Sequence, residues 1–324
     1  MTHTATISLV ITVLNEERSI GAWLETLGKQ SRLPDELIVC DGGSSDRTVA
    51  ILEEWAQDAP FRVTIVVSPG ANISEGRNRA IAAASGEWLA VTDAGTTLDE
   101  SWLSQLAQRR GHADVVSGFF YPIGDKLFER LLATLITFRV EEIDPQKFLP
   151  SSRSLLIRKS VWAKVDGYPE WLDYCEDLVF DLEVRESGAR FVFAPDALVS
   201  WSARSSLRAF AKQYFRYGRG DGKANLWAKR HVARYGVYGA GVVMMVTSPF
   251  GWLSTLALLA GGYLVYSGRY TRRVVRSERL PISEKVLGVA IAPLIMAVGD
   301  VAKMIGYPIG LAWRSGKRRE GLAL

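Results

Sequence analysis

The chain has 324 residues, of which 48% are apolar and 23% charged, a composition that supplies a large buried core and excludes an intrinsically disordered protein. The net charge of +4 hides an asymmetry: residues 1–200 carry 19 Lys and Arg against 30 Asp and Glu, whereas residues 201–324 carry 20 against 5. A basic region of this kind is expected to face an anionic partner, either nucleic acid or a phospholipid surface.

The first part of the chain alternates short apolar runs with helical patterns. Strands are expected at ISLVITVL, ELIVC, RVTIVV and EWLAVT, with helices beginning near Glu16, Ser45, Ser74 and Glu100. The runs are apolar throughout, as in strands buried on both faces. The pattern therefore predicts an α/β fold, with a Rossmann-like, mainly parallel sheet flanked by helices. No basic segment precedes the first strand, so no signal peptide is expected.

Polar residues follow three of these predicted strands. Asn15 and Glu16 follow the first, DGGSSD (41–46) ends the second, and Asp93 follows the fourth. Ligands of such sheets bind outside the carboxyl ends of the strands, so these residues are expected to meet at one edge. An acidic edge would repel an anion but would hold a base, a ribose or a divalent cation.

Two apolar segments in the C-terminal part of the chain indicate membrane association. No residue from 235 to 268 is charged, and Pro249 and Gly251 interrupt this run, which predicts either one long tilted span or a helical hairpin. A second apolar segment, 286–313, is expected to be a weaker span or an interfacial helix in which Asp300 pairs with Lys303. The alternative is a pair of buried helices in a soluble core.

Arg- and Lys-rich stretches flank both apolar segments. Positive flanks favour the cytoplasmic side, beside anionic lipid, so we expect the cell inner membrane with the bulk of the chain in the cytoplasm. Nucleic acid is disfavoured as a partner because these arginines flank apolar segments instead of alternating with exposed aromatic residues.

Four ordered motifs resemble family 2 of the glycosyltransferases, inverting enzymes with the GT-A nucleotide-diphospho-sugar transferase fold. They are VITVLNEERSI (10–20), ELIVCDGGSSDRT (36–48), GRNRAIAAASGEWLAVTDAG (76–95) and CEDLVFDLEV (175–184). The resemblance implies a catalytic domain over 1–220, with a nucleotide-binding half at 1–117 and an acceptor half at 118–220. Residues 221–324 would form the membrane-associated helical region.

The resemblance also implies how a nucleotide sugar, UDP-linked by analogy, would be bound. Thr12, Asn15 and Glu16 would border the nucleoside, and Asp41 would accept hydrogen bonds from uracil or ribose, since an ionised acid is an acceptor only. Gly42, like Gly43, would let the backbone turn beside the base. Arg77 would reach the nucleotide or else form a surface salt bridge.

In the family, the strand end at Asp93 carries an Asp-x-Asp that holds Mg²⁺ or Mn²⁺ on the diphosphate. Here Gly95 replaces the second acid. One carboxylate together with substrate phosphates can still hold a hydrated cation, so the resemblance implies a divalent metal at Asp93 with uncertain dependence on it.

By the same resemblance, Asp177 would be the general base that takes a proton from the acceptor hydroxyl, with Glu176 and Asp181 as alternatives on the same helix. The competing interpretation of all three acids is a solvated helix face. Arg216, in a Gln213-x-x-Arg216-Tyr217 pattern similar to that of processive polysaccharide synthases, would bind the diphosphate or else the membrane surface.

The acceptor is expected to be lipid-linked or a glycan, as in polysaccharide biosynthesis. The apolar stripe of residues 127–136 would touch the bilayer, line a groove for the acceptor, or pack in a core. Two other functions compete: a membrane-anchored nucleotide-sugar-binding protein with little turnover, and a sugar nucleotidyltransferase. The donor sugar, the acceptor, the number of crossings and the oligomeric state are left open.

Overall fold

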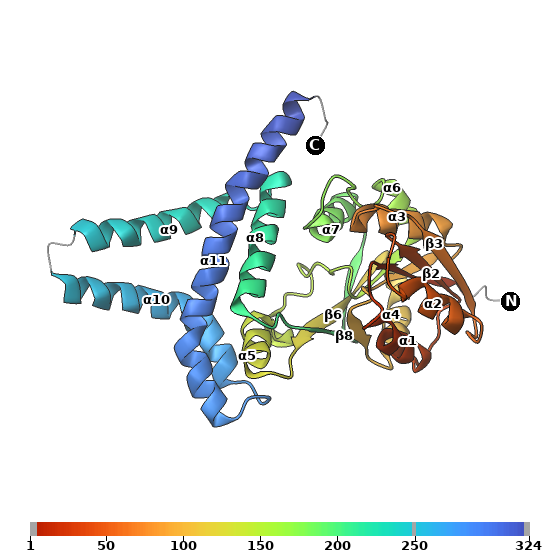
Figure 1. The fold of residues 1–324 in the computed structure, drawn as a ribbon, viewed down its shortest axis with the longest axis horizontal. Helices are drawn as coiled ribbons and strands as arrows, with labels where there is room; N and C mark the ends of the chain where they lie inside the picture. Colours follow the sequence, from red (N-terminus) through yellow and green to blue (C-terminus); the bar gives the residue numbers. More distant parts are fainter. Residues whose placement is uncertain (1–4, 248–250, 321–324) are drawn as a thin grey trace. The chain divides into compact units, whose positions relative to one another are not determined.

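The structure, a computed structural model, describes residues 5–247 and 251–320. The chain forms two compact units, each described here by itself: unit 1 is Met1–Tyr121 with Phe138–Ser202, and unit 2 is Pro122–Thr137 with Ala203–Leu324 (Figure 1). The division expected at residue 220 falls inside helix α8, Leu207–Lys223. Residues 122–137 join unit 2, although the sequence analysis grouped them with the acceptor half.

Unit 1 is built on an eight-stranded sheet of order β3-β2-β1-β4-β7-β6-β8-β5. The strands are β1 (Ile7–Val13), β2 (Glu36–Asp41), β3 (Arg62–Val67), β4 (Trp88–Val91), β5 (Thr96–Leu98), β6 (Val115–Ile123), β7 (Leu155–Arg158) and β8 (Phe191–Ser202). The first four are mutually parallel, whereas β7 runs antiparallel to β4 and to β6, and β5 antiparallel to β8.

The helices of unit 1 are α1 (Ile20–Gly28), α2 (Thr48–Ala56), α3 (Ile73–Ala83), α4 (Trp102–Gln108), α6 (Lys159–Lys164) and α7 (Glu176–Glu186). Alternate residues of β1 point to opposite faces of the sheet. Leu9 and Ile11 pack with Trp23 of α1 in one buried cluster, and Val10 packs with Ile81 of α3 in another. The predicted α/β fold with helices on both faces is confirmed.

Helix α3 is the element that carries Arg77 toward the sheet. Its N-terminus is fixed by a capping box, in which Asn72 accepts from the backbone N–H of Glu75 while the Glu75 carboxylate accepts from the N–H of Asn72. Gly76 lets the helix approach β1, because a Cβ there would lie 3.0 Å from Cγ2 of Thr12. The first turn of α3 is thereby held against the carboxyl end of β1.

Unit 2 is helical, with α5 (Leu127–Ile136), α8 (Leu207–Lys223), α9 (Ala228–Thr247), α10 (Trp252–Val275) and α11 (Ile282–Arg319). Its core joins α5, α8, α10 and α11, and Leu131, Leu132 and Leu135 of α5 are fully buried in it. The apolar stripe at 127–136 is therefore mainly core packing, with Leu127 left 40% exposed at the start of the helix.

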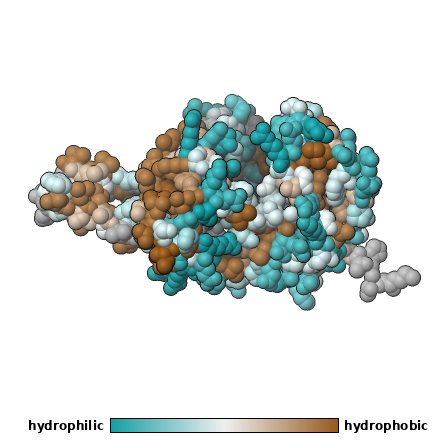
Figure 2. Space-filling view, turned by 60° about the horizontal axis from the view of Figure 1, so that its bottom comes forward, coloured by the Kyte–Doolittle hydropathy of each residue, from teal (hydrophilic) through white to brown (hydrophobic). Residues whose placement is uncertain are grey.

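The uncharged run at 235–268 lies on two helices, α9 and α10, which extend side by side in Figure 1. Pro249 lies outside the described residues. Apolar side chains are exposed on both helices, namely Val242, Val243, Met245, Val246, Trp252, Leu253, Leu256 and Leu258. Figure 2 shows extensive brown, hydrophobic surface on the helical part of the chain. Exposed apolar surface of this extent marks an interaction site.

Helix α11, with 38 residues, is the one helix within 5–247 and 251–320 that is long and apolar enough to cross a membrane. Its Asp300 does not pair with Lys303 as expected. Instead, the Asp300 carboxylate accepts from Nε of Arg234 on α9 at 2.7 Å, and the Lys303 ammonium lies 5.3 Å from the ring centroid of Tyr214 on α8. Asp300 and Lys303 thus contact side chains of different neighbouring helices.

Glycines allow α8 and α11 to pack backbone against backbone. A Cβ added at Gly218 or Gly222 of α8 would come within 2.5 Å of a carbonyl oxygen of α11, and one at Gly306 or Gly310 of α11 within 2.2 Å of a carbonyl oxygen of α8. Both helices thus carry a small-xxx-small pair, a pattern that permits close helix approach in lipid.

We predict that Gly306→Ala destabilises unit 2 by about 1–3 kcal/mol, because the new methyl group would meet the carbonyl of Phe215, which cannot move without shifting α8. Gly316→Ala is the matched control on the same helix, where a Cβ meets no atom within 4 Å. Hydrogen exchange of α8 amides in the purified chain measures the effect. Equal protection in the two variants would contradict the prediction.

Candidate active site

The turns after β1 and β2 are cross-braced by hydrogen bonds. The backbone N–H of Asn15 donates to Oγ of Ser44 at 2.8 Å, and Oδ1 of Asn15 accepts from the N–H of Ser45 at 2.9 Å. Asn15 adopts a left-handed backbone with φ of 55°, which an asparagine tolerates better than most residues. The two turns therefore form one surface at the carboxyl edge of the sheet, as the sequence predicts.

Asp41 organises the β2 turn. It is 1% exposed, and its carboxylate accepts from the N–H groups of Gly43 and Ser44, both at 2.9 Å, and from the Ser44 hydroxyl at 2.5 Å. An ionised carboxylate has about four acceptor positions, so these three donors occupy most of them. Gly43, with φ of 97°, is the glycine that the turn requires, more than Gly42.

Thr12 and Glu16 lie on either side of the turn after β1. Thr12 is half-buried near the end of β1. The backbone N–H of Glu16 donates to Oγ1 of Thr48 at 2.8 Å, and the Glu16 carboxylate accepts from the Ser19 hydroxyl. Helix α1 begins at Ile20, four residues after the predicted start, and a hydrogen-bonded turn over residues 16–19 precedes it. The nucleoside-binding roles of these residues remain predictions.

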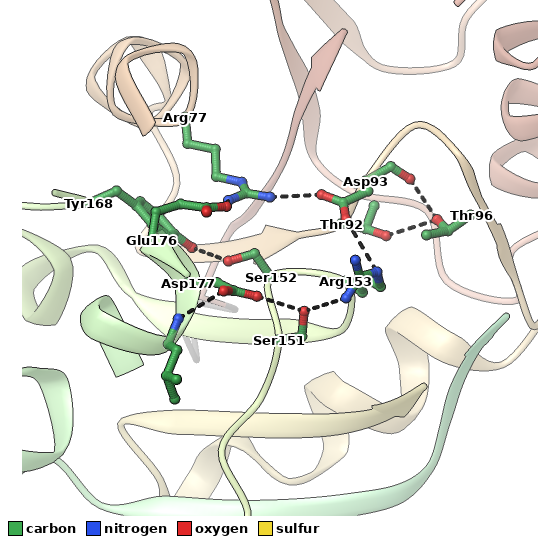
Figure 3. A network of polar contacts seen from close by, with 11 residues as sticks. Arg77, Thr92, Asp93, Thr96, Ser151, Ser152, Arg153, Tyr168, Glu176 and Asp177 are labelled. Atoms are coloured by element: carbon green, nitrogen blue, oxygen red, sulfur yellow. Dashed lines mark hydrogen bonds and ion pairs between the residues drawn. The ribbon is translucent and has the colours of Figure 1, made fainter. Parts of the chain in front are cut away.

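Arg77 joins two acids that are far apart in the sequence. Its guanidinium donates to Oδ1 of Asp93 and to Oε1 of Glu176, each at 2.8 Å, and its side chain is 3% exposed (Figure 3). Burial by itself would lower the pKa of Arg77, but the carboxylates of Asp93 and Glu176 raise it by more. The net pKa lies above the usual value for arginine, so the group stays charged. The alternative of a surface salt bridge is wrong, since Arg77 forms a buried double ion pair.

Helix α7 begins with the two acids of the Glu-Asp pair. Asp177 is half-buried, and its carboxylate accepts from the Ser151 hydroxyl at 3.0 Å and from the N–H of Leu178 at 2.9 Å. Glu176 is 7% exposed, and its pKa is raised mainly by burial and also by the neighbouring Asp177. Burial and Asp177 also raise the pKa of Asp181, which is 2% exposed.

The solvated-face interpretation of these acids is therefore wrong for Glu176 and Asp181. Of the three, only Asp177 is partly exposed, and it lies in the first turn of α7. Asp177 is therefore the most accessible of these acids, and its role as general base remains a prediction.

Arg153 and Ser151 belong to the site, although the sequence analysis missed both. Nε of Arg153 lies 3.5 Å from Oδ2 of Asp93, and its Nη1 donates to Oγ of Ser151 at 3.0 Å. Because β7 is antiparallel to β4, with Leu155 opposite Val91, the segment before β7 meets the carboxyl end of β4. A polar Ser-Ser-Arg-Ser run before a buried strand was the available signal.

These contacts make one network at one edge of unit 1. Asp177 is bonded to Ser151, Ser151 to Arg153, and Arg153 is paired with Asp93 (Figure 3). Residues 8–162 match the family model described as glycosyl transferase family 2. The chain belongs to this family.

Two curated relatives and one solved structure illustrate the similarity of this glycosyltransferase to known proteins. The succinoglycan biosynthesis protein ExoA of Rhizobium meliloti is 28% identical over 68% of this chain and 70% of its own length. The glycosyltransferase AglE of Haloferax volcanii is 25% identical over 66% and 72%. The mannosyltransferase PcManGT of Pyrobaculum calidifontis, solved with GDP-Man and Mn²⁺, superposes with a TM-score of 0.63 at 17% identity, covering 93% and 88% of the chains. The predicted GT-A fold is confirmed.

The residues around Asp93 in this glycosyltransferase do not fit a resident divalent cation. Among the described residues, no group of three or more His, Cys, Asp and Glu side chains could hold a metal ion. Both oxygens of Asp93 lie against guanidinium groups, and Gly95 supplies no second carboxylate. Cations of this class need several oxygen ligands, so Asp93 alone is a weak site.

Arg216 lies on α8 and so belongs to unit 2 of the glycosyltransferase. In the same helix, Nε2 of Gln213 donates to the hydroxyl of Tyr217 at 2.7 Å, and Oε1 of Gln213 accepts from Nε of Arg204 at 3.2 Å. The Gln-x-x-Arg-Tyr pattern thus has an ordered helical setting. Its proposed contact with the diphosphate remains a prediction.

A separate pocket of about 260 Å³ lies at the opposite edge of the sheet, where β1 and β2 begin. Its acid, Glu36, accepts from Ser8, Ser85 and the guanidinium of Arg62. Burial raises the pKa of Glu36, but these bonds lower it more, to about 2. Its second acid, Asp35, accepts from the backbone N–H of Ile7 at 2.7 Å. The acids of this pocket are thus bonded to neighbouring groups of the protein, so we assign it a structural role.

Proposed function

We propose that the chain transfers a sugar from a nucleotide-diphospho-sugar, UDP-linked, to a lipid-linked or glycan acceptor, with inversion at the anomeric carbon. The observation that carries this proposal is the network that joins Asp177 to Asp93 through Ser151 and Arg153. It brings a partly exposed carboxylate, suited to accept a proton, to the edge where a nucleotide is expected.

In the proposed reaction the acceptor hydroxyl attacks the anomeric carbon of the donor sugar. Asp177 takes the hydroxyl proton as the new C–O bond forms. The bond from the anomeric carbon to the β-phosphate oxygen breaks, and its electron pair leaves with the nucleoside diphosphate. Attack and departure on opposite faces in one displacement invert the configuration. Positioning of the acceptor beside the base supplies much of the rate.

Asp41, Thr12, Asn15, Glu16 and Gly42 are proposed to hold the nucleoside. They surround the joined turns after β1 and β2, and Asp41 keeps one acceptor position for an imide N–H or a ribose hydroxyl. A uracil offers such an N–H. The rigid bracing by Asn15 and Ser45 would limit the ordering cost of binding.

Unit 2 is proposed to associate with the cytoplasmic face of the cell inner membrane. Support comes from the exposed apolar side chains of α9 and α10, the length of α11, and the basic residues 317–319 at the end of α11. An acceptor in polysaccharide biosynthesis agrees with the similarity to the succinoglycan biosynthesis protein of Rhizobium. A membrane setting would let a lipid-linked acceptor reach the enzyme without leaving the surface.

Donor choice tests the proposal. The purified full-length chain is incubated with UDP- and GDP-sugars, and released nucleoside diphosphate and thermal unfolding are both measured. We expect UDP-sugars to raise the unfolding temperature and to release UDP. Binding without release would favour the nucleotide-sugar-binding alternative, and release of sugar phosphate by added pyrophosphate would favour the nucleotidyltransferase. If no nucleotide sugar binds, the proposed function is wrong.

A further inference from the structure

Asp93 lies between two arginines that differ in exposure. Arg77 is 3% exposed and is shared with Glu176 at 2.8 Å. Arg153 is 26% exposed, and its Nε lies 3.5 Å from Asp93, a looser contact than the 2.8 Å of Arg77. The buried Arg77 is thus committed to these two acids, whereas Arg153 is the more exposed of the two arginines.

Arg153 is also held in place by groups other than Asp93. Its guanidinium stacks 5.2 Å from the ring centroid of Trp201 on β8, and it donates to Ser151 at 3.0 Å. A stacked arginine keeps its planar fork in a fixed orientation, and that fork matches two oxygens of a phosphate. The side chain therefore has the chemistry and the support of an anion-binding group.

Three carboxylates and two guanidinium groups lie at this edge before a donor arrives. Asp93 and Glu176 pair with Arg77, Asp93 also faces Arg153, and Asp177 is hydrogen-bonded to Ser151. The second acid of a metal-binding pair is replaced by Gly95, where a Cβ would meet no atom within 4 Å. A diphosphate entering this space would find a guanidinium close by but no set of carboxylates able to hold a metal.

We propose that Arg153 binds the diphosphate of the donor and stabilises the departing nucleoside diphosphate, so that transfer proceeds without a divalent metal ion. This inference rests on the proposed function and names the group that binds the leaving phosphate. As the bond to the anomeric carbon breaks, negative charge grows on the β-phosphate oxygen, and Arg153 lies where it can neutralise that charge. Ser151 is hydrogen-bonded to both Arg153 and Asp177, so one residue positions the proposed base and the group that binds the leaving phosphate.

The test compares binding of UDP and of uridine in EDTA, by calorimetry, for the wild type, Arg153→Ala and Arg153→Lys. We expect the wild type to prefer UDP, Arg153→Ala to lose about 100-fold in UDP affinity with unchanged uridine affinity, and Arg153→Lys to be intermediate because it keeps the charge but not the fork. Arg190→Ala is the control, since this 66% exposed arginine pairs with Asp114 at the surface. Unchanged uridine binding shows that the variants are folded.

Turnover provides the second readout. We expect wild-type release of UDP in EDTA to stay within twofold of that with Mg²⁺ or Mn²⁺, and Arg153→Ala to lose about 100-fold in kcat with partial recovery on addition of free guanidinium. Loss of wild-type activity and UDP binding in EDTA, or UDP binding by Arg153→Ala equal to that of the wild type, would overturn the inference while leaving the glycosyltransferase function intact. If UDP binding depends on Arg153 but no sugar is released or transferred, the proposed function fails and the diphosphate contact stands.

Discussion

Replacing Asp177 with asparagine should lower kcat for sugar transfer by about 10²–10⁴-fold, the range that general bases contribute. Asparagine has nearly the same shape but cannot take the proton of the acceptor hydroxyl. It can still accept a hydrogen bond from Ser151 through its single carbonyl oxygen. Donor KM should therefore change little, and the measurement is steady-state UDP release in the presence of acceptor over a range of donor concentrations.

Glu176→Gln is the matched control for this prediction, because Glu176 is the alternative base and the adjacent residue. It is buried against Arg77 and should affect activity mainly through the position of that arginine. Asp177→Asn should therefore lose more in kcat than Glu176→Gln at equal donor affinity. The reverse order, with both variants folded by circular dichroism, would transfer the role of base to Glu176.

The sequence was sufficient to predict the parallel half of the sheet and the edge that carries the acids. Buried parallel strands leave long apolar runs, and the polar turns after β1, β2 and β4 follow those runs directly. Helix starts were less accurate, as at α1, where a separate hydrogen-bonded turn over residues 16–19 precedes the helix. Local pattern does not encode these bonds.

The parts that sequence did not predict depend on contacts between distant residues. The surface salt bridge expected for Arg77 was wrong because Glu176, its second partner, lies 99 residues away, whereas the contact of Arg77 with the nucleotide stays a prediction. Arg153 was missed because only the antiparallel return of β7 beside β4 brings it to Asp93. Likewise, the apolar stripe of α5 has its packing partners on α8, α10 and α11, far along the chain. Its period indicated a helix but not which helices would cover it.

Replacing Arg77 with methionine should destabilise unit 1 by about 3–5 kcal/mol, the usual effect of removing one member of a buried ion pair. Methionine fills much of the volume of the arginine stem but leaves the carboxylates of Asp93 and Glu176 without their shared cation. Hydrogen exchange of the β1 and β4 amides in the full chain reports this loss within unit 1. Arg77→Lys, which keeps a charge but cannot span both acids, should be less destabilised.

The pH dependence of this loss separates charge from packing. The folded-state pKa of Glu176 is already raised, first by burial and then by Asp177, and removing Arg77 should raise it further. An acid whose pKa is raised by folding favours the folded state at low pH, and that contribution is lost as pH rises through the folded pKa. Arg77→Met should therefore lose more stability, relative to the wild type, at pH 8 than at pH 5. Adding Glu176→Gln to this variant should restore part of the lost stability at pH 8, because it removes one uncompensated charge. A deficit that is equal at both pH values and unaffected by Glu176→Gln would mean that Arg77 acts through packing alone.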